Sequence, residues 1–550
     1  MRILRSTLAG ALLLMVLAVP AGALASAPQT FGFHGGGYDN ASAMTVDATG
    51  NVFIGGSVDT AGSQATFAVV KLGPAGTVLW RRTYSGSLGG FGGTASAVTV
   101  DGAGNVYAAG HVGDGVIFNN NLDYLVVKFG PDGSERWARR YNGPGNNTDL
   151  AHHVAVDGGG NVYVSGFSYG QGYDWATLKL SPAGAVLWER RHSGPGSGDD
   201  RPADMALAPG GNLVLTGQTM NTGDGMTADI ETLTYDPQGA VVGQRRWTAT
   251  AISHERARDM DLDAAGRIAI TGTTAENASP YAVPFPVTLR YTAAGELIQT
   301  IEGEGAGGDA VDVDGSGAVF LAGALIGTPA GSAVAKYDAG GARSWLTQLA
   351  LEPSDALRVV GVAAGAGGSA TVAGTVVDVF NHDEDYLTIR YGADGRELWR
   401  HRFEGAGQGG DRAAALAVDG ADAAWVTGTS WGNYLSIGGT ADDIVTLKFA
   451  AGAAPALLAP TELSATGVSV GAIQLRWRDN AGTETGFAIE RCLGAGCTNF
   501  AQVASVGRDV TSHVDTGLAR NTQYSYRVRA TGAGGNSAYS NITSAKTRRR

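Results

Sequence analysis

Short runs of β-branched and aromatic residues, bounded by glycine, aspartate and proline, follow one another along almost the whole chain. The clearest example lies at residues 100–110, where the turn Asp-Gly-Ala-Gly-Asn separates two such runs. Residues 156–166 repeat it with the turn Asp-Gly-Gly-Gly-Asn. Because Asp-Gly and Gly-Asn supply the positive φ that tight hairpins need, this pattern predicts antiparallel β-hairpins. No helical period appears after residue 25.

This first hairpin occurs eight times along the chain. Its closing glycine recurs at intervals of 51 to 56 residues: Gly56, Gly110, Gly166, Gly217, Gly272, Gly323, Gly374 and Gly428. In seven copies a second hairpin follows, and in five of them a tryptophan stands four residues after its turn glycine: Trp80, Trp137, Trp188, Trp345 and Trp399. Each unit of about 53 residues therefore holds four short antiparallel strands, which is the size and content of a β-propeller blade.

The number of blades follows from counting strands. The first three strands of the unit occur eight times, but the fourth occurs only seven times, because the sequence after Phe449 turns to alanine and glycine. Residues 30–35 have the pattern of the missing strand, so we expect them to complete the last blade and close the ring, which removes exposed sheet edges. Residues 26–450 are thus predicted to form an all-β, eight-bladed β-propeller, with seven blades as the alternative if one degenerate copy lies outside the ring.

The repeat also resembles a known family. The hairpin Asp-x-x-Gly-Asn-Val-Tyr-Val-x-Gly, followed by Asp-Tyr-x-x-x-Lys-x-x-x-x-Gly-x-x-x-Trp, is similar to the bacterial β-propeller repeats called SBBP. The resemblance covers residues 29 to about 450 and is most specific in the first three units. The family is named for seven blades, from which the count of eight departs. The resemblance implies an exported scaffold without a shared catalytic residue.

The first 25 residues have the pattern of a secretory signal peptide. Arg2 and Arg5 precede an apolar run from Leu8 to Val19, and Ala-Leu-Ala at 23–25 fits a cleavage site, with Ala-Ser-Ala at 25–27 as the second choice. No later stretch is apolar and long enough to span a membrane. These features predict a bacterial protein that is secreted or held at the cell surface.

A second domain follows a linker of small residues at 451–459. In residues 460–547 apolar and polar positions alternate over several strands, with Trp477 on the core face and a Leu518–Tyr524 spacing that looks like a tyrosine corner. Together these features resemble an immunoglobulin-like fibronectin type III domain. A short basic tail, residues 548–550, ends the chain as given.

Composition and cysteine content narrow the function further. Glycine accounts for 85 of 550 residues, as many tight turns require, and a hydrophobic content of 44% with only 16% charged residues argues against disorder. The net charge of −12 argues against nucleic acid or an anionic membrane as a partner. Cys492 and Cys497 are the only cysteines, and in an exported protein we expect a disulfide between them rather than a metal site.

Few residues suggest chemistry. In five units an acidic residue stands eight positions before the aspartate position of the first turn: Asp39, Asp149, Asp200, Glu255 and Asp411. This regular recurrence predicts structural hydrogen bonds to the backbone. Asp312-Val-Asp314-Gly-Ser-Gly has the alternating oxygens of a calcium loop but lacks its closing glutamate, and His382-Asp-Glu-Asp385 lies in a long loop. We therefore predict no catalytic residue, metal site or cofactor, with calcium as the one alternative.

The connections that differ between units are the expected binding regions. Their aromatic and amide side chains suit sugars or peptides. The candidate binding residues are Asn119, Tyr169, Trp175, Tyr281, Trp431 and Tyr434. The predicted function is an exported, non-enzymatic scaffold that presents propeller loops to an extracellular glycan or protein. The alternatives are an extracellular enzyme that acts on polysaccharide through acidic residues of the propeller channel, and a self-associating structural protein of the cell surface.

Overall fold

The chain folds almost entirely into β-strands. The computed structural model describes residues 29–33, 38–59, 65–84, 92–113, 121–221, 227–250, 252–275, 284–302, 307–325, 331–352, 355–378, 383–405, 410–431, 442–450, 457–481, 484–508, 510–532 and 535–550. Within these ranges there are forty strands, and the one helical element is a single 3-10 turn at Ala366–Gly368. The described residues contain no helix with the length and hydropathy of a membrane span. The predicted all-β class is confirmed.

Residues 29–449 form eight units of four antiparallel strands, called sheets 1 to 8. Sheets 1 to 4 consist of β2 (Asn40–Val46), β3 (Val52–Val58), β4 (Thr66–Leu72) and β5 (Val78–Tyr84); β6 (Gly93–Val100), β7 (Val106–Gly113), β8 (Leu122–Phe129) and β9 (Glu135–Tyr141); β10 (Asp149–Val156), β11 (Val162–Tyr169), β12 (Tyr173–Leu180) and β13 (Val186–His192); and β14 (Arg201–Leu207), β15 (Leu213–Met220), β16 (Ala228–Tyr235) and β17 (Val241–Trp247).

Sheets 5 to 7 repeat the same order, and sheet 8 takes its fourth strand from the other end of the chain. They consist of β18 (His254–Leu262), β19 (Ile268–Ala275), β20 (Phe285–Tyr291) and β21 (Leu297–Glu302); β22 (Gly307–Val313), β23 (Val319–Leu325), β24 (Gly331–Tyr337) and β25 (Arg343–Gln348); β26 (Asp355–Ala364), β27 (Ala370–Asp378), β28 (Glu384–Tyr391) and β29 (Glu397–Phe403); and β30 (Asp411–Val418), β31 (Ala424–Trp431), β32 (Asp442–Phe449) and β1 (Gln29–Phe33).

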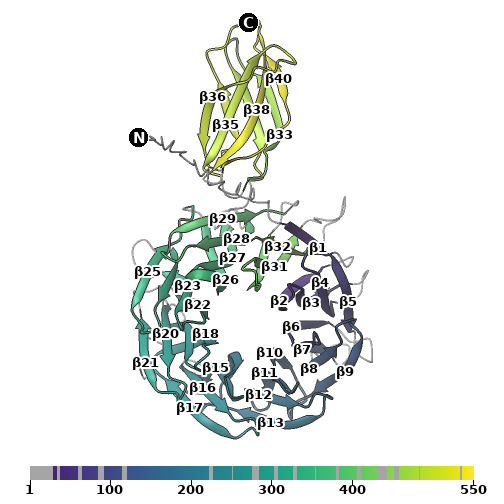
Figure 1. Ribbon diagram of the computed structural model, residues 1–550, viewed down its shortest axis with the longest axis vertical. Coiled ribbons are helices and arrows are strands. Elements are labelled where there is room, and N and C mark those ends of the chain that lie inside the picture. The colour runs from purple at the N-terminus through teal and green to yellow at the C-terminus, as the bar shows by residue number, and fades with distance from the viewer. Residues whose placement is uncertain are drawn as a thin grey trace, which may run out of the picture.

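The sheets follow one another around a ring, with their first strands innermost (Figure 1). Each first strand contacts the first strand of the next sheet, and β30 contacts β2, so the last sheet lies against the first. The pairing of β1 with β32 runs from Gln29 opposite Lys448 to Phe33 opposite Ile444. The expectation that an N-terminal strand completes the last sheet is therefore confirmed. One parallel bridge, Ala228 to His254, also joins sheets 4 and 5.

Steric crowding explains why a glycine closes the first hairpin in every sheet. In each of the eight sheets the first strand carries a bulge opposite this glycine, as between Ala151 and His153 opposite Gly166. A Cβ atom on Gly166 would lie 2.0 Å from the carbonyl oxygen of Leu150, and at the other seven glycines it would lie between 1.9 and 2.4 Å from a carbonyl oxygen. Only glycine fits at this position.

The tryptophan of the fourth strand ties neighbouring sheets together. The indole N–H of Trp188 donates to the carbonyl of Pro237 in the next sheet at 3.2 Å, and the Lys179 ammonium donates to the same oxygen at 2.8 Å. The turn glycine Gly239 lies directly under the Trp188 ring, where a Cβ atom would be 2.9 Å from a ring carbon. Similar bonds recur around the ring: Trp80 to Pro131, Trp137 to Pro182, Trp345 to Ala393, and Lys448 of sheet 8 to Pro74 of sheet 1.

The two ends of the ring differ in how their connections vary. Every turn between first and second strands, and between third and fourth strands, has five residues. We call the end that carries these turns the turn end. The connections between second and third strands lie at the opposite end, which we call the loop end, and they range from three residues at 170–172 to ten residues at 432–441. Variation in the length of the connections is therefore concentrated at the loop end.

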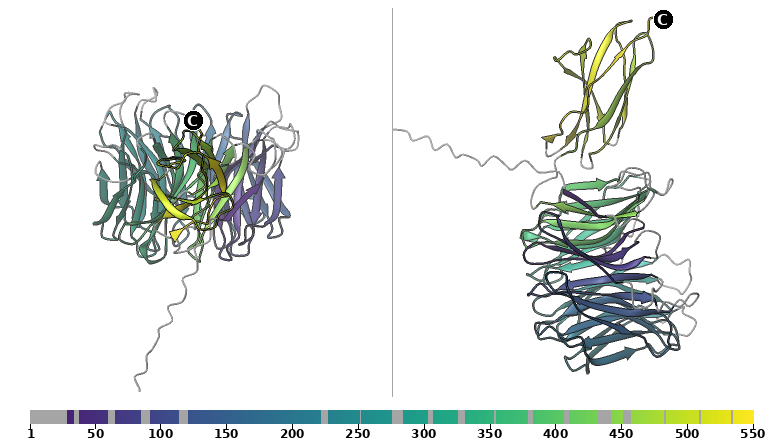
Figure 2. Two further views of the ribbon diagram at one scale, coloured as in Figure 1. Left: turned by 90° about the horizontal axis from the view of Figure 1, so that it is seen from above. Right: turned by 90° about the vertical axis from the view of Figure 1, so that its right-hand side faces the viewer.

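Residues 461–546 form a separate sandwich of two antiparallel sheets (Figure 2). One contains β33 (Thr461–Gly467), β34 (Ile473–Arg478) and β37 (Ser512–Asp515); the other contains β35 (Gly486–Leu493), β36 (Ala501–Gly507), β38 (Gln523–Gly532), β39 (Gly535–Asn536) and β40 (Thr543–Lys546). Trp477 is buried in its core, and the Tyr524 hydroxyl accepts a hydrogen bond from the amide of Ala519 at 3.1 Å, as in a tyrosine corner. Cys492 and Cys497 form a disulfide bond.

Candidate functional site at the loop end of the ring

The recurring acidic residues at the starts of the first strands are fully buried and hold the adjoining chain. Asp149 accepts a hydrogen bond from the amide of Gly143 at 2.6 Å, and Asp200 accepts bonds from Gly194 at 2.5 Å and Met220 at 2.6 Å. The predicted structural role is confirmed, and burial raises the pKa of both carboxyls. The other three make comparable bonds: Asp39 with the amide of Asp59, Glu255 with that of Ala249, and Asp411 with that of Gly405.

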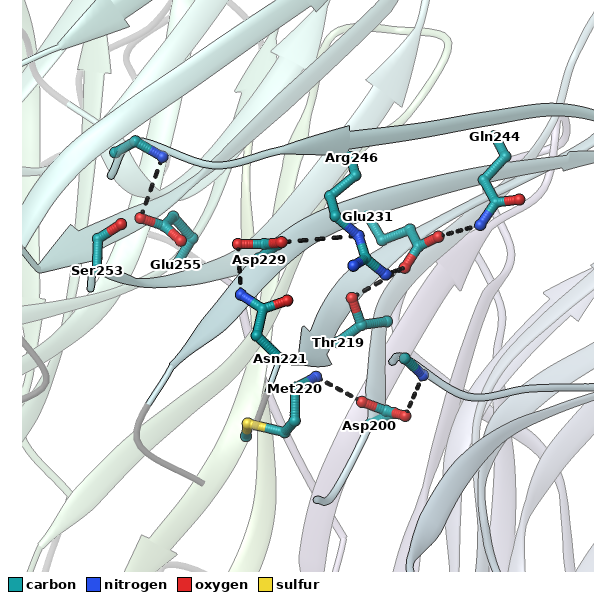
Figure 3. Close-up of polar contacts among 12 residues, drawn as sticks. Asp200, Thr219, Met220, Asn221, Asp229, Glu231, Gln244, Arg246, Ser253 and Glu255 are labelled. Carbon is teal, nitrogen blue, oxygen red and sulfur yellow. Dashed lines mark hydrogen bonds and ion pairs between the residues drawn. The ribbon is translucent and has the colours of Figure 1, made fainter. Parts of the chain in front are cut away.

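A larger buried polar cluster lies within sheet 4, between the contacts of Asp200 and those of Glu255 (Figure 3). Its centre is Glu231 on β16, whose carboxylate accepts hydrogen bonds from Thr219 at 2.9 Å, Gln244 at 2.5 Å and Arg246 at 2.9 Å. Burial opposes ionisation, but hydrogen bonds from His192, Gln244 and Arg246 outweigh it and lower the pKa of Glu231 to about 2. A carboxylate held in this way is ionised and fully engaged, so it stabilises sheet 4 and its contact with His192 of sheet 3.

A second recurring interaction at the loop end is an ion pair between the third and fourth strands. An aspartate near the start of the third strand faces an arginine 17 residues later: Asp123–Arg140 at 2.9 Å, Asp174–Arg191 at 3.0 Å, Asp229–Arg246 at 3.6 Å and Asp385–Arg402 at 2.6 Å. This pair was not predicted from the sequence. The constant spacing is the signal that could have identified it.

Carboxyl groups also meet on the inner strands of sheets 4 to 6. Asp259 on β18 lies beside Asp204 on β14 and accepts a hydrogen bond from the amide of Val311 on β22 at 2.7 Å. Burial and the neighbouring carboxylate raise the pKa of Asp259 well above its usual value. Asp261 lies beside Asp312 of β22. Burial is the larger cause and the hydrogen bond with Asp312 the smaller one, and together they raise the pKa of Asp261 to about 7. A second carboxyl group in contact disfavours the ionised form, so both neighbours act in the same direction as burial.

The Asp261–Asp312 pair predicts a pH dependence of stability. Because the folded pKa of Asp261 lies near 7 and the unfolded value near 3.8, the stabilisation is present below pH 4 and is lost as the pH rises through 7. We expect Asp261 alone to lower the free energy of unfolding by about 2 kcal/mol between pH 5 and pH 8. Asp261→Asn should reduce the total fall by about that amount and leave the part that other buried carboxyl groups with a raised pKa, such as Asp385 and Asp411, contribute. Denaturant titrations at both pH values measure it. An unchanged slope in the variant would contradict the assignment, with Asp411, whose pKa burial raises to about 7, as the next group to test.

An aromatic cluster with a charged pair lies at the loop end where sheets 3 and 4 meet. Tyr169 and Tyr173 face each other across the three-residue connection of β11 and β12, with ring centroids 5.3 Å apart, and Phe167 lies 5.0 Å from Tyr173. The guanidinium of Arg201 on β14 lies 4.7 Å from the Phe167 ring and 5.4 Å from the Tyr173 ring. Asp199 pairs with Arg201 at 3.4 Å, and about half of each of these two side chains is exposed.

The predicted binding residues have different outcomes. Tyr169 lies in the aromatic cluster and is partly exposed. The prediction for Trp175 is wrong: it lies within β12, is 1% exposed, and donates its indole N–H to the carbonyl of Gln218 in sheet 4. It packs between sheets because the connection before β12 is shorter than expected. Asn119, Tyr281 and Tyr434 lie outside the described residues.

Trp431 belongs to a second aromatic group at the loop end. It ends β31, is 38% exposed, and lies 6.1 Å from the ring of Tyr38, which is 56% exposed. Tyr38 precedes the first strand of sheet 1, so the two rings come from the first and last sheets of the ring and meet where sheet 8 contacts sheet 1. This pair is the most exposed aromatic contact in the part of the chain that the structure describes.

In the calcium-like loop at residues 312–317 the aspartate oxygens accept hydrogen bonds from backbone amides. The Asp314 carboxylate accepts bonds from the amides of Ser316 and Ala318 at 2.9 and 3.0 Å, while Asp312 accepts one from the amide of Ala364 at 2.6 Å. Among the described residues there is no group of three or more histidine, cysteine, aspartate or glutamate side chains placed to hold a metal. These bonds give both aspartates a structural role in the turn and between sheets 6 and 7.

A cleft of about 870 Å³ lies between sheet 7 and the sandwich. Asp355 and Asp385 line it from the ring, and Arg478 and Arg508 line it from the sandwich. The two aspartates already pair with Arg402, at 3.1 and 2.6 Å. The aromatic cluster of sheets 3 and 4 has the more suitable chemistry for a ligand, because it combines partly exposed rings with an exposed donor and an exposed acceptor.

Comparison with known proteins identifies the C-terminal domain. Residues 458–546 match the model of the fibronectin type III domain family, which confirms the domain predicted at 460–547. No curated protein matches the chain. The architecture of the ring is therefore defined by its strands and contacts alone.

Three solved structures illustrate the similarity of the sandwich. An Fn3-like protein from Clostridium thermocellum is 27% identical, over 17% of this chain and 94% of that one, with a TM-score of 0.15. A structure described as a myokine is 21% identical over 17% of this chain and all of that one, with a TM-score of 0.16. The FN5 domain of Drosophila Lar is 22% identical over 17% and 97%, with a TM-score of 0.15.

Proposed function

We propose that this protein is an exported, non-enzymatic binding scaffold: an eight-bladed β-propeller of SBBP-like repeats that presents its loop end to an extracellular glycan or protein, followed by a fibronectin type III domain as a spacer or second module. The observation that carries the proposal is the contrast between the two ends of the ring. All turns at the turn end have five residues, whereas the connections at the loop end range from three to ten residues. A constant frame that varies at one end is typical of a binding scaffold.

The polar residues at the loop end support binding more than catalysis. The buried acids Asp149, Asp200 and Glu231 are engaged by backbone amides or by cations. The exposed groups at this end include aromatic rings and the pair Asp199–Arg201. Aromatic rings beside a few polar groups form binding sites without chemistry of their own. Export by the predicted signal peptide would expose this face outside the cell, on a protein that is either released or held at the surface.

The test is a binding screen with the chain from residue 26 onward. The protein is labelled and exposed to cell-envelope fractions and to a panel of polysaccharides. Saturable binding that is competed by excess unlabelled protein supports the scaffold. Turnover of a polysaccharide without retained binding would contradict it.

One observation favours an enzyme as the second candidate. Asp259 and Asp261 have a raised pKa, and each lies beside a second carboxyl group on the inner strands. Glycoside hydrolysis uses one carboxyl group of raised pKa as the acid and a second, ionised one. However, both carboxyl groups accept a hydrogen bond from a backbone amide of the next sheet, Asp259 from Val311 and Asp261 from Val313 at 2.8 Å. These bonds favour a structural role. Reducing-sugar release that Asp261→Asn abolishes would establish the enzyme.

A further inference from the structure

We infer that the cluster of Tyr169, Tyr173, Asp199 and Arg201, named the Tyr–Arg platform, binds a neutral glycan chain by stacking a sugar ring on the tyrosines and hydrogen-bonding its hydroxyl groups to the Asp199–Arg201 pair. The inference rests on the proposed binding function and assigns a place and a ligand class to it. It depends on three observations: how the platform is held, which groups it exposes, and how its charge is balanced.

The platform is rigidly held from below. Asp199 and Arg201 flank Asp200, whose buried carboxylate is fixed by the amides of Gly194 and Met220. The amide of Asp200 donates to the carbonyl of Tyr173 at 2.7 Å, which joins sheet 4 to the start of β12. The recurring buried acid therefore fixes the backbone on both sides of itself, and the two exposed residues on either side keep their places without a ligand. Such preorganisation lowers the entropic cost of binding.

The tyrosine rings are fixed in the same way. Tyr169 and Tyr173 are direct partners in the β11–β12 pair, separated by only Gly170, Gln171 and Gly172. The rings meet edge to face at 74°, and Tyr173 also packs edge to face on the buried Phe167. Both tyrosines keep part of their surface exposed, and stacking Arg201 over Phe167 and Tyr173 keeps the guanidinium beside them. An amphipathic surface results, apolar on the rings and polar at one edge.

The charge of the platform selects the class of ligand. Arg201 and Asp199 lie 3.4 Å apart and cancel one another, and the whole chain carries a net charge of −12. A polyanionic chain would be repelled by Asp199 and by the net negative charge of the protein, while a polycation would be repelled by Arg201. A neutral sugar needs both a donor and an acceptor for each hydroxyl group, and the pair supplies one of each. Its apolar C–H face fits an aromatic ring.

The experiment measures binding of defined oligosaccharides by calorimetry. The probes are neutral hexasaccharides of glucose, mannose and galactose, with hexagalacturonate as the anionic comparison. We expect at least one neutral probe to bind and hexagalacturonate to bind more weakly. Tyr173→Ala and Arg201→Ala should each weaken binding by about ten-fold, which corresponds to about 1.4 kcal/mol for the lost contact. Arg136→Ala, which removes an exposed arginine paired with Asp132 at the turn end, is the matched control and leaves binding unchanged.

Each other outcome has a defined meaning. Preferred binding of hexagalacturonate overturns the ligand class. Neutral-glycan binding that survives both platform variants but is lost in Trp431→Ala overturns the site and leaves the proposed function standing. Binding of a cell-envelope protein with no oligosaccharide bound overturns the inference alone, and no binding of any kind overturns both. Thermal unfolding of each variant shows whether a loss of binding reflects a loss of fold; Tyr173→Phe and Arg201→Lys are the second variants if the alanine forms unfold.

Discussion

Gly166→Ala is expected to lower the free energy of unfolding by about 3 kcal/mol or more. The added Cβ atom would lie 2.0 Å from the carbonyl oxygen of Leu150 and 2.8 Å from the Cα atom of Ala151, both of which belong to the backbone of β10. Neither atom can rotate away, as the end of a side chain could, so the bulge or the strand pairing must change. Overpacking that forces a backbone shift costs roughly 1–3 kcal/mol and sometimes more, and the pairing of β10 with β11 is lost in addition if the bulge is expelled.

A matched control lies in the same hairpin. Gly158 occupies the turn between β10 and β11, and a Cβ atom there would meet no atom within 4 Å. Gly158→Ala is therefore expected to change stability by less than about 0.5 kcal/mol, as surface substitutions usually do. Chemical denaturation of both variants measures the difference. Equal stabilities of the two variants would show that the bulge relaxes without cost and that close approach does not explain the recurring glycine.

The repeat explains why much of the ring could be predicted from the sequence. The closing glycine meets a requirement that returns in every sheet, the close backbone approach seen at Gly166. The turn aspartates and the fourth-strand tryptophans recur in most sheets, as with Trp188, which reaches the carbonyl of Pro237 in the next sheet. A steric or hydrogen-bonding requirement that returns from sheet to sheet produces a repeated residue pattern that can be read from a single sequence. The N-terminal strand was predictable for the same reason, since its residues have the pattern of the fourth strand that sheet 8 lacks.

The candidate site was less predictable because its residues come from different sheets. Tyr169 was identified from its position after a strand, but Arg201 meets its ring cluster only because sheets 3 and 4 are neighbours in space. Trp175 was assigned to a loop because the length of the connection was overestimated, and the structure places it between two sheets instead. A contact that forms between only one pair of sheets leaves no periodic signal, which is why the platform appears only in the structure.

Deleting residues 29–33 is expected to have an effect as large as that of the glycine variant, and through a different mechanism. The deletion removes β1, which pairs with β32 over five residues from Gln29 to Phe33. At roughly 0.5–1.5 kcal/mol net for each hydrogen bond, the loss amounts to about 3 kcal/mol or more. It also leaves β32 as a bare edge next to the contact between sheets 8 and 1, where Lys448 reaches the carbonyl of Pro74 at 2.9 Å. An uncovered edge strand pairs with other chains.

The deletion variant should therefore unfold at lower denaturant concentration than the chain from residue 26, and light scattering should show concentration-dependent association that the parent lacks. A synthetic peptide of residues 26–36 added in trans is expected to restore the monomer and part of the stability by taking the place of β1 on β32, whereas a scrambled peptide of the same composition is not. If the deletion leaves stability and monomer state unchanged, sheet 8 does not need its N-terminal strand. If the scrambled peptide rescues equally well, the rescue depends on composition rather than on the register from Gln29–Lys448 to Phe33–Ile444.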